Sequence, residues 1–230
     1  MTGGGTPGAA GGPWLWDGPA PAPSGGGPGT AAARRRGASA ERQLPDAVLF
    51  DRDGTLVVDV PYNGDPARVT PMPSARAAVS ALRRLGVPLG VVSNQSGVAR
   101  GLLTRRQVEA VRRRVDALFG PFALWAVCPH GPDTGCGCRK PAPGLVTAAC
   151  ERLGASPGRT VVIGDIGSDL EAARSAGARG VLVPTPATRA EEVAGADACA
   201  ADLMAAVRLA LGSVPVGRFA VPGRSAGRSR

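Results

Sequence analysis

The residues Ala-Val-Leu-Phe-Asp-Arg-Asp-Gly-Thr, at positions 47 to 55, indicate both the fold class and the place of a binding site. The apolar run 47–50 is typical of a short strand buried on both faces of a parallel sheet. Asp51 and Asp53 follow at once, and Gly54 allows a sharp turn. Ligands of parallel sheets bind at the carboxyl ends of the strands, so we expect both carboxylates to face a ligand. Asp and Gly are also common in ordinary surface turns, so this stretch alone leaves that alternative open.

Four further apolar runs alternate with amphipathic stretches along the rest of the chain. Strands are predicted at 88–92, 124–127, 160–163 and 180–183, and helices at 74–85, 104–119, 143–153, 168–176 and 200–211. Thr104 with Gln107, and Ser168 with Glu171, have the spacing of capping boxes. Strands that alternate with helices predict an α/β fold, a Rossmann-like parallel sheet with helices on both faces. No insertion is long enough for a large cap domain.

The two ends differ in composition from the middle. Gly and Pro, 34 and 22 residues in total, are concentrated near the N-terminus and after residue 212. We therefore expect a disordered Gly/Pro/Arg-rich extension over 1–43, one folded domain over 44–212 and a disordered basic tail over 213–230. The formal charge of +9 belongs largely to the ends, since residues 46–212 carry only +3. This weak positive charge argues against a nucleic-acid-binding domain.

Polar side chains follow two other predicted strands. The residues Ser-Asn-Gln-Ser-Gly occupy 93–97 and can bind a phosphate through hydroxyl and backbone N–H groups. Asp165 ends the fourth predicted strand, and Asp169 lies one helical turn later. Taken alone, Asp169 is explained by a helix dipole. Together, the acidic ends of two strands and the hydroxyl end of a third predict a site for Mg²⁺ and a phosphate group.

Lys140 is the only lysine of the chain, beside 26 arginines. A composition that uses arginine wherever a positive charge suffices suggests that position 140 requires a compact ammonium group. The alternative is that this single lysine is present by chance and has no special role.

Three cysteines and the only histidine lie within eleven residues: Cys128, His130, Cys136 and Cys138. Two close pairs with five residues between them fit a tetrahedral Zn²⁺ site. Four protein ligands would make this a closed, structural site, a small zinc-bound loop just before Lys140. We expect Cys150 and Cys199 to be small buried residues of helices.

The four ordered motifs, Asp51 to Thr55, Ser93 to Gly97, Arg139-Lys140-Pro141 and Gly164-Asp165 with Asp169, resemble those of the haloacid dehalogenase (HAD) superfamily. The cysteine and histidine cluster is similar to that of its histidinol-phosphatase-related branch. The resemblance covers residues 49–183. It implies a Mg²⁺-dependent phosphomonoester hydrolase that forms an aspartyl-phosphate.

The resemblance also implies roles for individual residues. Asp51 would be the nucleophile and Asp53 the general acid and base, while Ser93 and Lys140 would bind the phosphoryl oxygens. The Mg²⁺ ligands would be the Asp51 carboxylate, the Asp53 carbonyl and Asp165, with Asp169 in a supporting role. The expected substrate contacts are Asp59, Tyr62, Asn63, Asn94, Gln95, Ser96 and Arg139.

The resemblance favours the sugar bisphosphate D-glycero-D-manno-heptose 1,7-bisphosphate as the substrate, with histidinol phosphate as the alternative. Ser93 stands where Thr is common in the branch, Ile166 where a polar residue is frequent, and the zinc loop is short; these departures leave the substrate open. An alternative of another class is a zinc-containing nucleic-acid-binding protein that uses its arginine-rich ends. No apolar run reaches the length of a membrane span and no signal peptide is recognisable. The cysteines suggest a metal site rather than disulfides, so we expect a location in the reducing cytoplasm. We also expect the protein to be a monomer.

Overall fold

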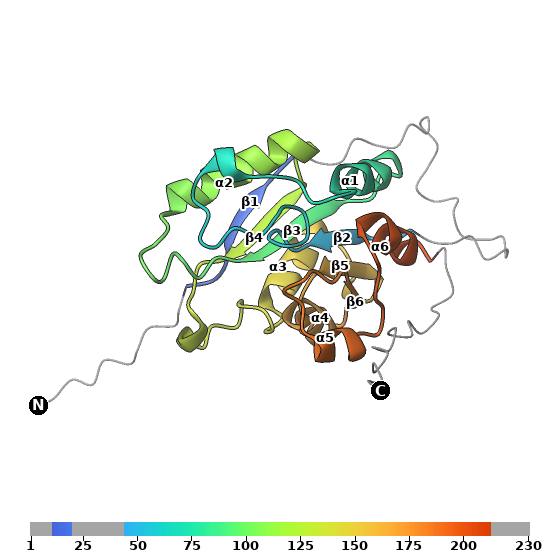
Figure 1. Cartoon of the computed structure of the whole chain (residues 1–230). Coiled ribbons are helices and arrows are strands. Elements are labelled where there is room, and N and C mark those ends of the chain that lie inside the picture. The colour runs from blue at the N-terminus through green and yellow to red at the C-terminus, as the bar shows by residue number, and fades with distance from the viewer. Residues whose placement is uncertain (1–10, 20–43, 213–230) are drawn as a thin grey trace, which may run out of the picture.

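The computed structural model describes residues 11–19 and 44–212, and these form one six-stranded sheet between two layers of helices (Figure 1). The strand order is β1-β4-β3-β2-β5-β6. The strands are β1 (Trp14–Asp17), β2 (Ala47–Phe50), β3 (Leu89–Asn94), β4 (Leu124–Cys128), β5 (Thr160–Gly164) and β6 (Arg179–Leu182). Strands β2 to β6 pair in parallel, and β1 runs antiparallel to β4 at one edge.

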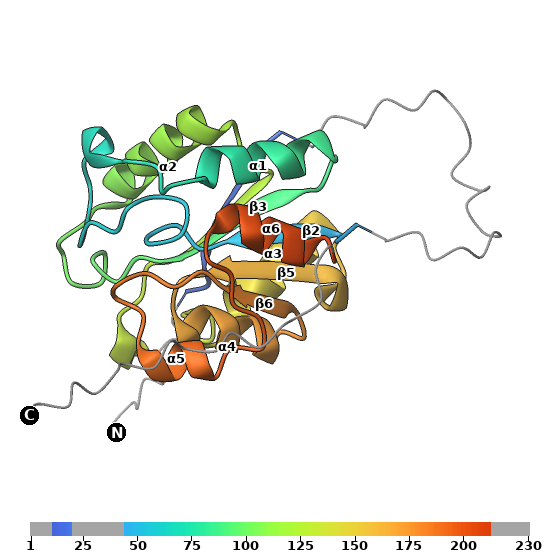
Figure 2. The same ribbon diagram turned by 45° about the vertical axis from the view of Figure 1, so that its right-hand side comes forward.

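Alternate residues of a strand point to opposite faces of the sheet, and helices cover both faces. Phe50 packs in the core under α1 (Ala75–Arg84), α2 (Arg105–Phe119) and α6 (Leu203–Ala210), whereas Leu49 packs under α3 (Gly144–Leu153) and α4 (Gly167–Ser175). The two turned views show these layers above and below the sheet (Figures 1 and 2). The strands are therefore apolar on both sides, as the short apolar runs predicted.

The predicted α/β class, the parallel sheet and the five strands from β2 to β6 are confirmed, with boundaries that differ by one or two residues. The capping box of Thr104 and Gln107 starts α2 as predicted. The capping box of Ser168 and Glu171 is wrong. Helix α4 begins at Gly167, and the Asp169 carboxylate accepts from the backbone N–H of Ile166.

The expectation of a disordered extension over 1–43 is wrong for residues 14–17. Trp14 and Trp16 face the α2 side of the sheet, where the Arg105 guanidinium lies 5.0 Å and 5.4 Å from the two ring centres. Asp17 faces the other side and accepts two hydrogen bonds from Arg152 of α3. These contacts lie more than 80 residues away along the chain, which explains why local composition did not predict them. The remainder of the extension, and the tail over 213–230, lie outside the described residues.

Short elements complete the described chain: the 3₁₀ turns η1 (Pro66–Arg68), η2 (Pro132–Thr134) and η3 (Pro157–Arg159), and the helix α5 (Ala190–Ala194). Helix α5 was not predicted because five residues show no helical period. Its Glu192 carboxylate accepts from the N–H of Gly167, which joins α5 to the start of α4. In the described ranges, no helix has the length and apolarity needed to cross a membrane.

Candidate active site

Four charged side chains meet at the carboxyl ends of the central strands. Asp51 follows β2, Asp165 follows β5, Asp169 lies in the first turn of α4, and Lys140 comes from the segment between β4 and α3. All four residues are buried. Carboxylate oxygens of the three aspartates lie within 4.8 Å of one another. The sheet thus brings together residues that are up to 118 positions apart in the sequence.

The Lys140 ammonium has three close oxygen neighbours in this cluster, and it donates hydrogen bonds to two of them. Its Nζ lies 2.5 Å from Oδ1 of Asp51, 2.6 Å from Oδ1 of Asp169 and 3.0 Å from the carbonyl oxygen of Val92. The position of Lys140 is fixed further by Asn94, whose side chain exchanges two hydrogen bonds with the Lys140 backbone. The ammonium is therefore held beside the carboxylate of Asp51.

The electrostatics of the cluster are unbalanced, with three carboxylates around one ammonium. Burial raises the pKa of Asp51 well above its usual range, although Lys140 opposes the rise. Burial, and then the charge of Asp169, raise the pKa of Asp165 to about 7. Burial alone would lower the pKa of Lys140, but Asp169 and Asp51 outweigh it, so that the pKa is raised. The cluster holds excess negative charge that a divalent cation would neutralise.

The residues of the cluster fit a Mg²⁺ ion, which prefers oxygen ligands and one or two carboxylates. Gly54 has a φ of +79°, and a side-chain carbon at this position would lie 2.2 Å from Oδ2 of Asp165. The loop after β2 therefore approaches Asp165 closely because residue 54 is glycine. The Thr55 hydroxyl donates to Oδ1 of Asp165 over 3.3 Å and orients that carboxylate.

Asp53 stands beside this cluster and belongs to a second network. Its Oδ2 accepts from Gln95 over 3.0 Å, and the same Gln95 amide donates to the Ser93 hydroxyl over 2.9 Å. Its two oxygens also accept from the guanidinium of Arg52. The Asp-x-Asp spacing places the first carboxylate in the cluster and the second next to the hydroxyl at the end of β3.

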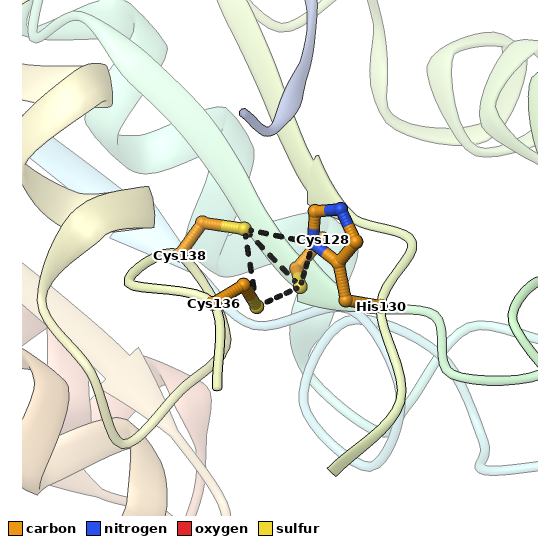
Figure 3. Close-up of side chains that lie close together, drawn as sticks. All are labelled: Cys128, His130, Cys136 and Cys138. Carbon is orange, nitrogen blue, oxygen red and sulfur yellow. Dashed lines mark hydrogen bonds between the residues drawn. The ribbon is translucent and has the colours of Figure 1, made fainter. Parts of the chain in front are cut away.

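The predicted zinc ligands converge from β4 and the loop after it (Figure 3). Cys128 Sγ lies 3.4 Å from Nδ1 of His130, 3.7 Å from Sγ of Cys136 and 3.3 Å from Sγ of Cys138. Ligands about 2.3 Å from a tetrahedral centre are roughly 3.8 Å apart, so this cluster fits a Zn²⁺ ion after small adjustments. Burial raises the pKa of the Cys128 and Cys138 thiols. Binding of Zn²⁺ would therefore release protons.

The expected substrate contacts form a less compact set. Asp59 and Tyr62 are largely exposed. Partial desolvation of the Asp59 carboxyl, and then the charge of Asp53, raise the pKa of Asp59. Asn63 is buried, and its side chain accepts from the N–H of Asp65, which fixes the loop. The half-buried Arg139 lies on the zinc loop, where it donates to the carbonyl of His130 over 3.4 Å.

The other three expected contacts come from the segment after β3. Asn94 holds Lys140 and Gln95 is buried on Asp53, so both serve neighbouring residues, while Ser96 is half-buried. Three residues that contact the site residues were not predicted from the sequence. Arg52 donates to the Asp53 carboxylate. The Thr188 hydroxyl donates to the carbonyl of Asp165 over 2.6 Å, and Arg100 donates to the hydroxyl of Tyr62 over 2.7 Å. Arg52 lies between Asp51 and Asp53, and this position was the only feature of the sequence that indicated a role for it.

Comparison with known proteins decides the family. The HAD-hydrolase-like family matches residues 137–208. The D-glycero-beta-D-manno-heptose-1,7-bisphosphate 7-phosphatase of Pseudomonas aeruginosa is 38% identical over 143 residues, which are 60% of this chain and 80% of that protein. The chain belongs to the HAD-like hydrolases. The recognised resemblance is confirmed, and this HAD-like protein is an enzyme of the phosphatase type.

Solved structures agree with this assignment. The D,D-heptose 1,7-bisphosphate phosphatase of Bordetella bronchiseptica, complexed with magnesium and phosphate, superimposes with a TM-score of 0.64 and 28% identity, over 73% of this chain and 99% of that one. A HAD-like phosphatase from Mesorhizobium loti gives a TM-score of 0.60 and 29% identity, over 86% of this chain and 94% of that one. The HAD-like phosphatase fold of this chain thus extends over nearly the whole of both neighbours.

Proposed function

We propose that this HAD-like phosphatase removes the 7-phosphate of D-glycero-D-manno-heptose 1,7-bisphosphate through an aspartyl-phosphate on Asp51. The observation that carries the proposal is the buried Asp51 at the end of β2 with the Lys140 ammonium 2.5 Å away. The relatives in Pseudomonas aeruginosa and Bordetella bronchiseptica bear the name of this activity, which supports the choice of substrate.

Asp51 is the nucleophile in the proposed reaction. One of its oxygens forms a bond to phosphorus while the bond from phosphorus to the sugar oxygen breaks. Asp53 supplies a proton to the leaving oxygen and then takes one from the water that hydrolyses the aspartyl-phosphate. The Ser93 hydroxyl and the Lys140 ammonium bind the phosphoryl oxygens. Asp169, 2.6 Å from Lys140, positions that ammonium.

Mg²⁺ would be held by the carboxylates of Asp51 and Asp165 and by the backbone carbonyl of Asp53. When bound, it offsets the repulsion between the nucleophile and the phosphate and acts as a Lewis acid on the phosphoryl group. Zn²⁺ would be held by Cys128, His130, Cys136 and Cys138 in a structural site. Because protein side chains would occupy all four ligand positions of the Zn²⁺ ion, no position would be left for a substrate.

The bisphosphate is favoured by Arg139, which lies on the zinc loop directly before Lys140 and carries a permanent charge. A planar guanidinium suits the second phosphate of a bisphosphate. Histidinol phosphate remains the second candidate because Asp59 is an exposed carboxylate near Asp53 that an ammonium group would contact. The family of HAD-like hydrolases, to which the chain belongs, argues against the remaining candidate, a nucleic-acid-binding protein.

The test is to compare kcat/KM for the heptose bisphosphate and for histidinol phosphate in the presence of Mg²⁺. We expect the heptose bisphosphate to be preferred. Arg139→Ala should reduce kcat/KM for it by about 1.5–3 kcal/mol, roughly 10- to 150-fold, and change that for histidinol phosphate little. The control is Arg76→Ala on the exposed side of α1, which should leave both values unchanged. A preference of the unmodified enzyme for histidinol phosphate, or equal losses on both substrates, would refute the substrate assignment.

A further inference from the structure

We propose that the outer surface of helices α1, α2 and α6 binds the phosphate backbone of a nucleic acid, in addition to the reaction at the active site. This surface, which we call the arginine face, consists of six exposed side chains: Arg76, Arg84, Arg106, Arg113, Arg114 and Arg208. None of them belongs to the aspartate cluster or to the cysteine and histidine cluster. The inference is therefore independent of the proposed phosphatase reaction.

Positive charge is concentrated in one layer of the molecule. Helices α1, α2 and α6 together contain nine arginines and two acidic residues, which is a net charge of +7. Helices α3, α4 and α5 contain two arginines and five acidic residues, which is a net charge of −3. The net charge of only +3 over residues 46–212 therefore conceals two layers of opposite sign. Such a basic layer attracts a polyanion although the domain as a whole is nearly neutral.

The three basic helices form one continuous layer. They cover the same face of the sheet, and α1 packs against both α2 and α6 (Figures 1 and 2). In α2 the buried side chains of Val108, Val111 and Val115 face the sheet, whereas Arg106 and Arg113, two turns apart, are exposed. The helical period thus directs the arginines outward from the layer.

The arginines of this face lack carboxylate partners, in contrast with those of the other layer. Arg152 of α3, Arg174 of α4 and Arg189, directly before α5, each form an ion pair. In the part of the chain that the structure describes, none of the six arginines of the arginine face forms one. The two acidic residues of α2 pair with Arg105 and Arg112 instead. A polyanion would therefore relieve the repulsion between uncompensated charges without breaking an ion pair.

A phosphodiester backbone fits this surface better than a lipid membrane does. Helices that lie on a membrane bury an apolar face at the boundary of the headgroups. The exposed large apolar side chains of the described chain lie outside α1, α2 and α6: Leu15, Leu44, Val58, Tyr62, Leu85, Leu102 and Ile166. Guanidinium groups match the geometry of phosphate oxygens, and contacts to phosphates do not depend on the base sequence. We therefore expect binding without sequence preference.

The experiment measures binding of the full chain to a fluorescent DNA duplex of about 20 base pairs by anisotropy, between about 50 and 200 mM salt. We expect a Kd in the micromolar range or below at the lowest salt, equal for two duplexes of unrelated sequence. The triple variant Arg84→Gln, Arg106→Gln, Arg113→Gln should bind about tenfold or more weakly. Its plot of log K against log salt should be less steep by about 2 to 3, because three phosphate contacts are lost.

The matched control is the triple variant Arg152→Gln, Arg174→Gln, Arg189→Gln, which removes three positive charges from the other layer. Its affinity should change less than about threefold, because those arginines are paired with carboxylates. Thermal unfolding shows whether both variants are folded. If the first is not, Arg106→Gln and Arg113→Gln are measured singly, each with an expected loss of about 1 in slope.

Four results would overturn the inference. The first is no binding of DNA by the unmodified chain, and the second is an equal loss of affinity in the two triple variants. The third is unchanged binding by the variant of the arginine face, which would assign the DNA contacts to the arginine-rich ends of the sequence. The fourth is binding to vesicles of phosphatidylcholine and phosphatidylserine in equal parts without binding to DNA, which would identify a membrane as the partner.

Discussion

Asp165 is a residue whose burial has opposite effects on stability and on metal binding. Burial and the neighbouring Asp169 raise its pKa from 3.8 to about 7. Between these values the folded protein binds a proton that the unfolded chain does not. The free energy of unfolding of the metal-free protein therefore falls as the pH rises from about 4 to about 7, by up to about 4 kcal/mol from this residue. A cation bound to the Asp165 carboxylate would offset this loss of stability, because it stabilises the ionised form.

We therefore predict that Asp165→Asn stabilises the protein when Mg²⁺ is absent. At pH 8 without Mg²⁺ the variant should unfold several degrees above the parent, and the difference should shrink at pH 5, where the parent carboxyl is protonated. Added Mg²⁺ should raise the unfolding temperature of the parent and leave that of the variant unchanged. Thermal unfolding at the two pH values, with and without Mg²⁺, checks this. A parent more stable than the variant at pH 8 without Mg²⁺ would contradict it.

The charged cluster was predictable residue by residue and the network around Asp53 was not. The sequence predicted Asp51 and Asp165 because each follows an apolar run. It predicted Lys140 because this is the only lysine of the chain. The partner of Asp53 is its own neighbour Arg52, and whether adjacent side chains pair depends on rotamers that the sequence does not specify. Gln95 was expected to face the substrate, but it points inward to Asp53.

At the scale of elements, the zinc loop links a metal site to the active-site lysine. Cys128 ends β4, and Cys138 lies two residues before Lys140. The carbonyl of Gly137 accepts from the N–H of Gly144, at the start of α3, over 2.9 Å. A segment with little regular structure of its own is thus fixed at one end by β4 and at the other by α3, with the four ligands between.

Loss of one ligand should therefore lower activity through Lys140. We expect about one Zn per chain after purification without added zinc. For Cys138→Ser we expect less bound Zn, a lower unfolding temperature and reduced kcat, because structural Zn²⁺ contributes roughly 10–16 kcal/mol of apparent binding free energy in small peptides. Metal analysis and activity assays measure these effects. Cys199→Ser, outside the cluster, is the control. Full activity in a zinc-free protein would refute the role of the loop.

Strand β1 is the element that sequence patterns missed. Four residues between Gly and Pro give no periodicity that separates a strand from a loop. Tertiary contacts explain why these residues form a strand. Trp16 lies against Arg105 and Arg112 of α2, and Asp17 pairs with Arg152 of α3. The strand also covers the edge of β4, whose backbone would otherwise be open to pairing.

At the scale of the whole molecule, sheet topology explains why a catalytic cluster could be predicted without a structure. Parallel strands send their carboxyl ends to one edge, so residues after β2, β3 and β5 meet wherever the sheet order makes them neighbours. Here β2 lies between β3 and β5, which places Asp51 at the centre. The strand order itself, the pairing of β1 and the joining of α5 to α4 depend on contacts distant in sequence. The monomeric state remains a prediction.

The central claim is that Asp51 carries the phosphoryl group, and trapping the phosphoenzyme tests it most directly. Enzyme mixed with substrate and Mg²⁺ would be quenched within one turnover, reduced with borohydride to convert an aspartyl-phosphate to homoserine, and digested with trypsin. Because trypsin cleaves after Arg52, Asp51 falls in the peptide 43–52 and Asp53 in the next one. The account predicts homoserine at position 51, and none in Asp51→Asn. Homoserine at position 53, or turnover without any modified peptide, would contradict it.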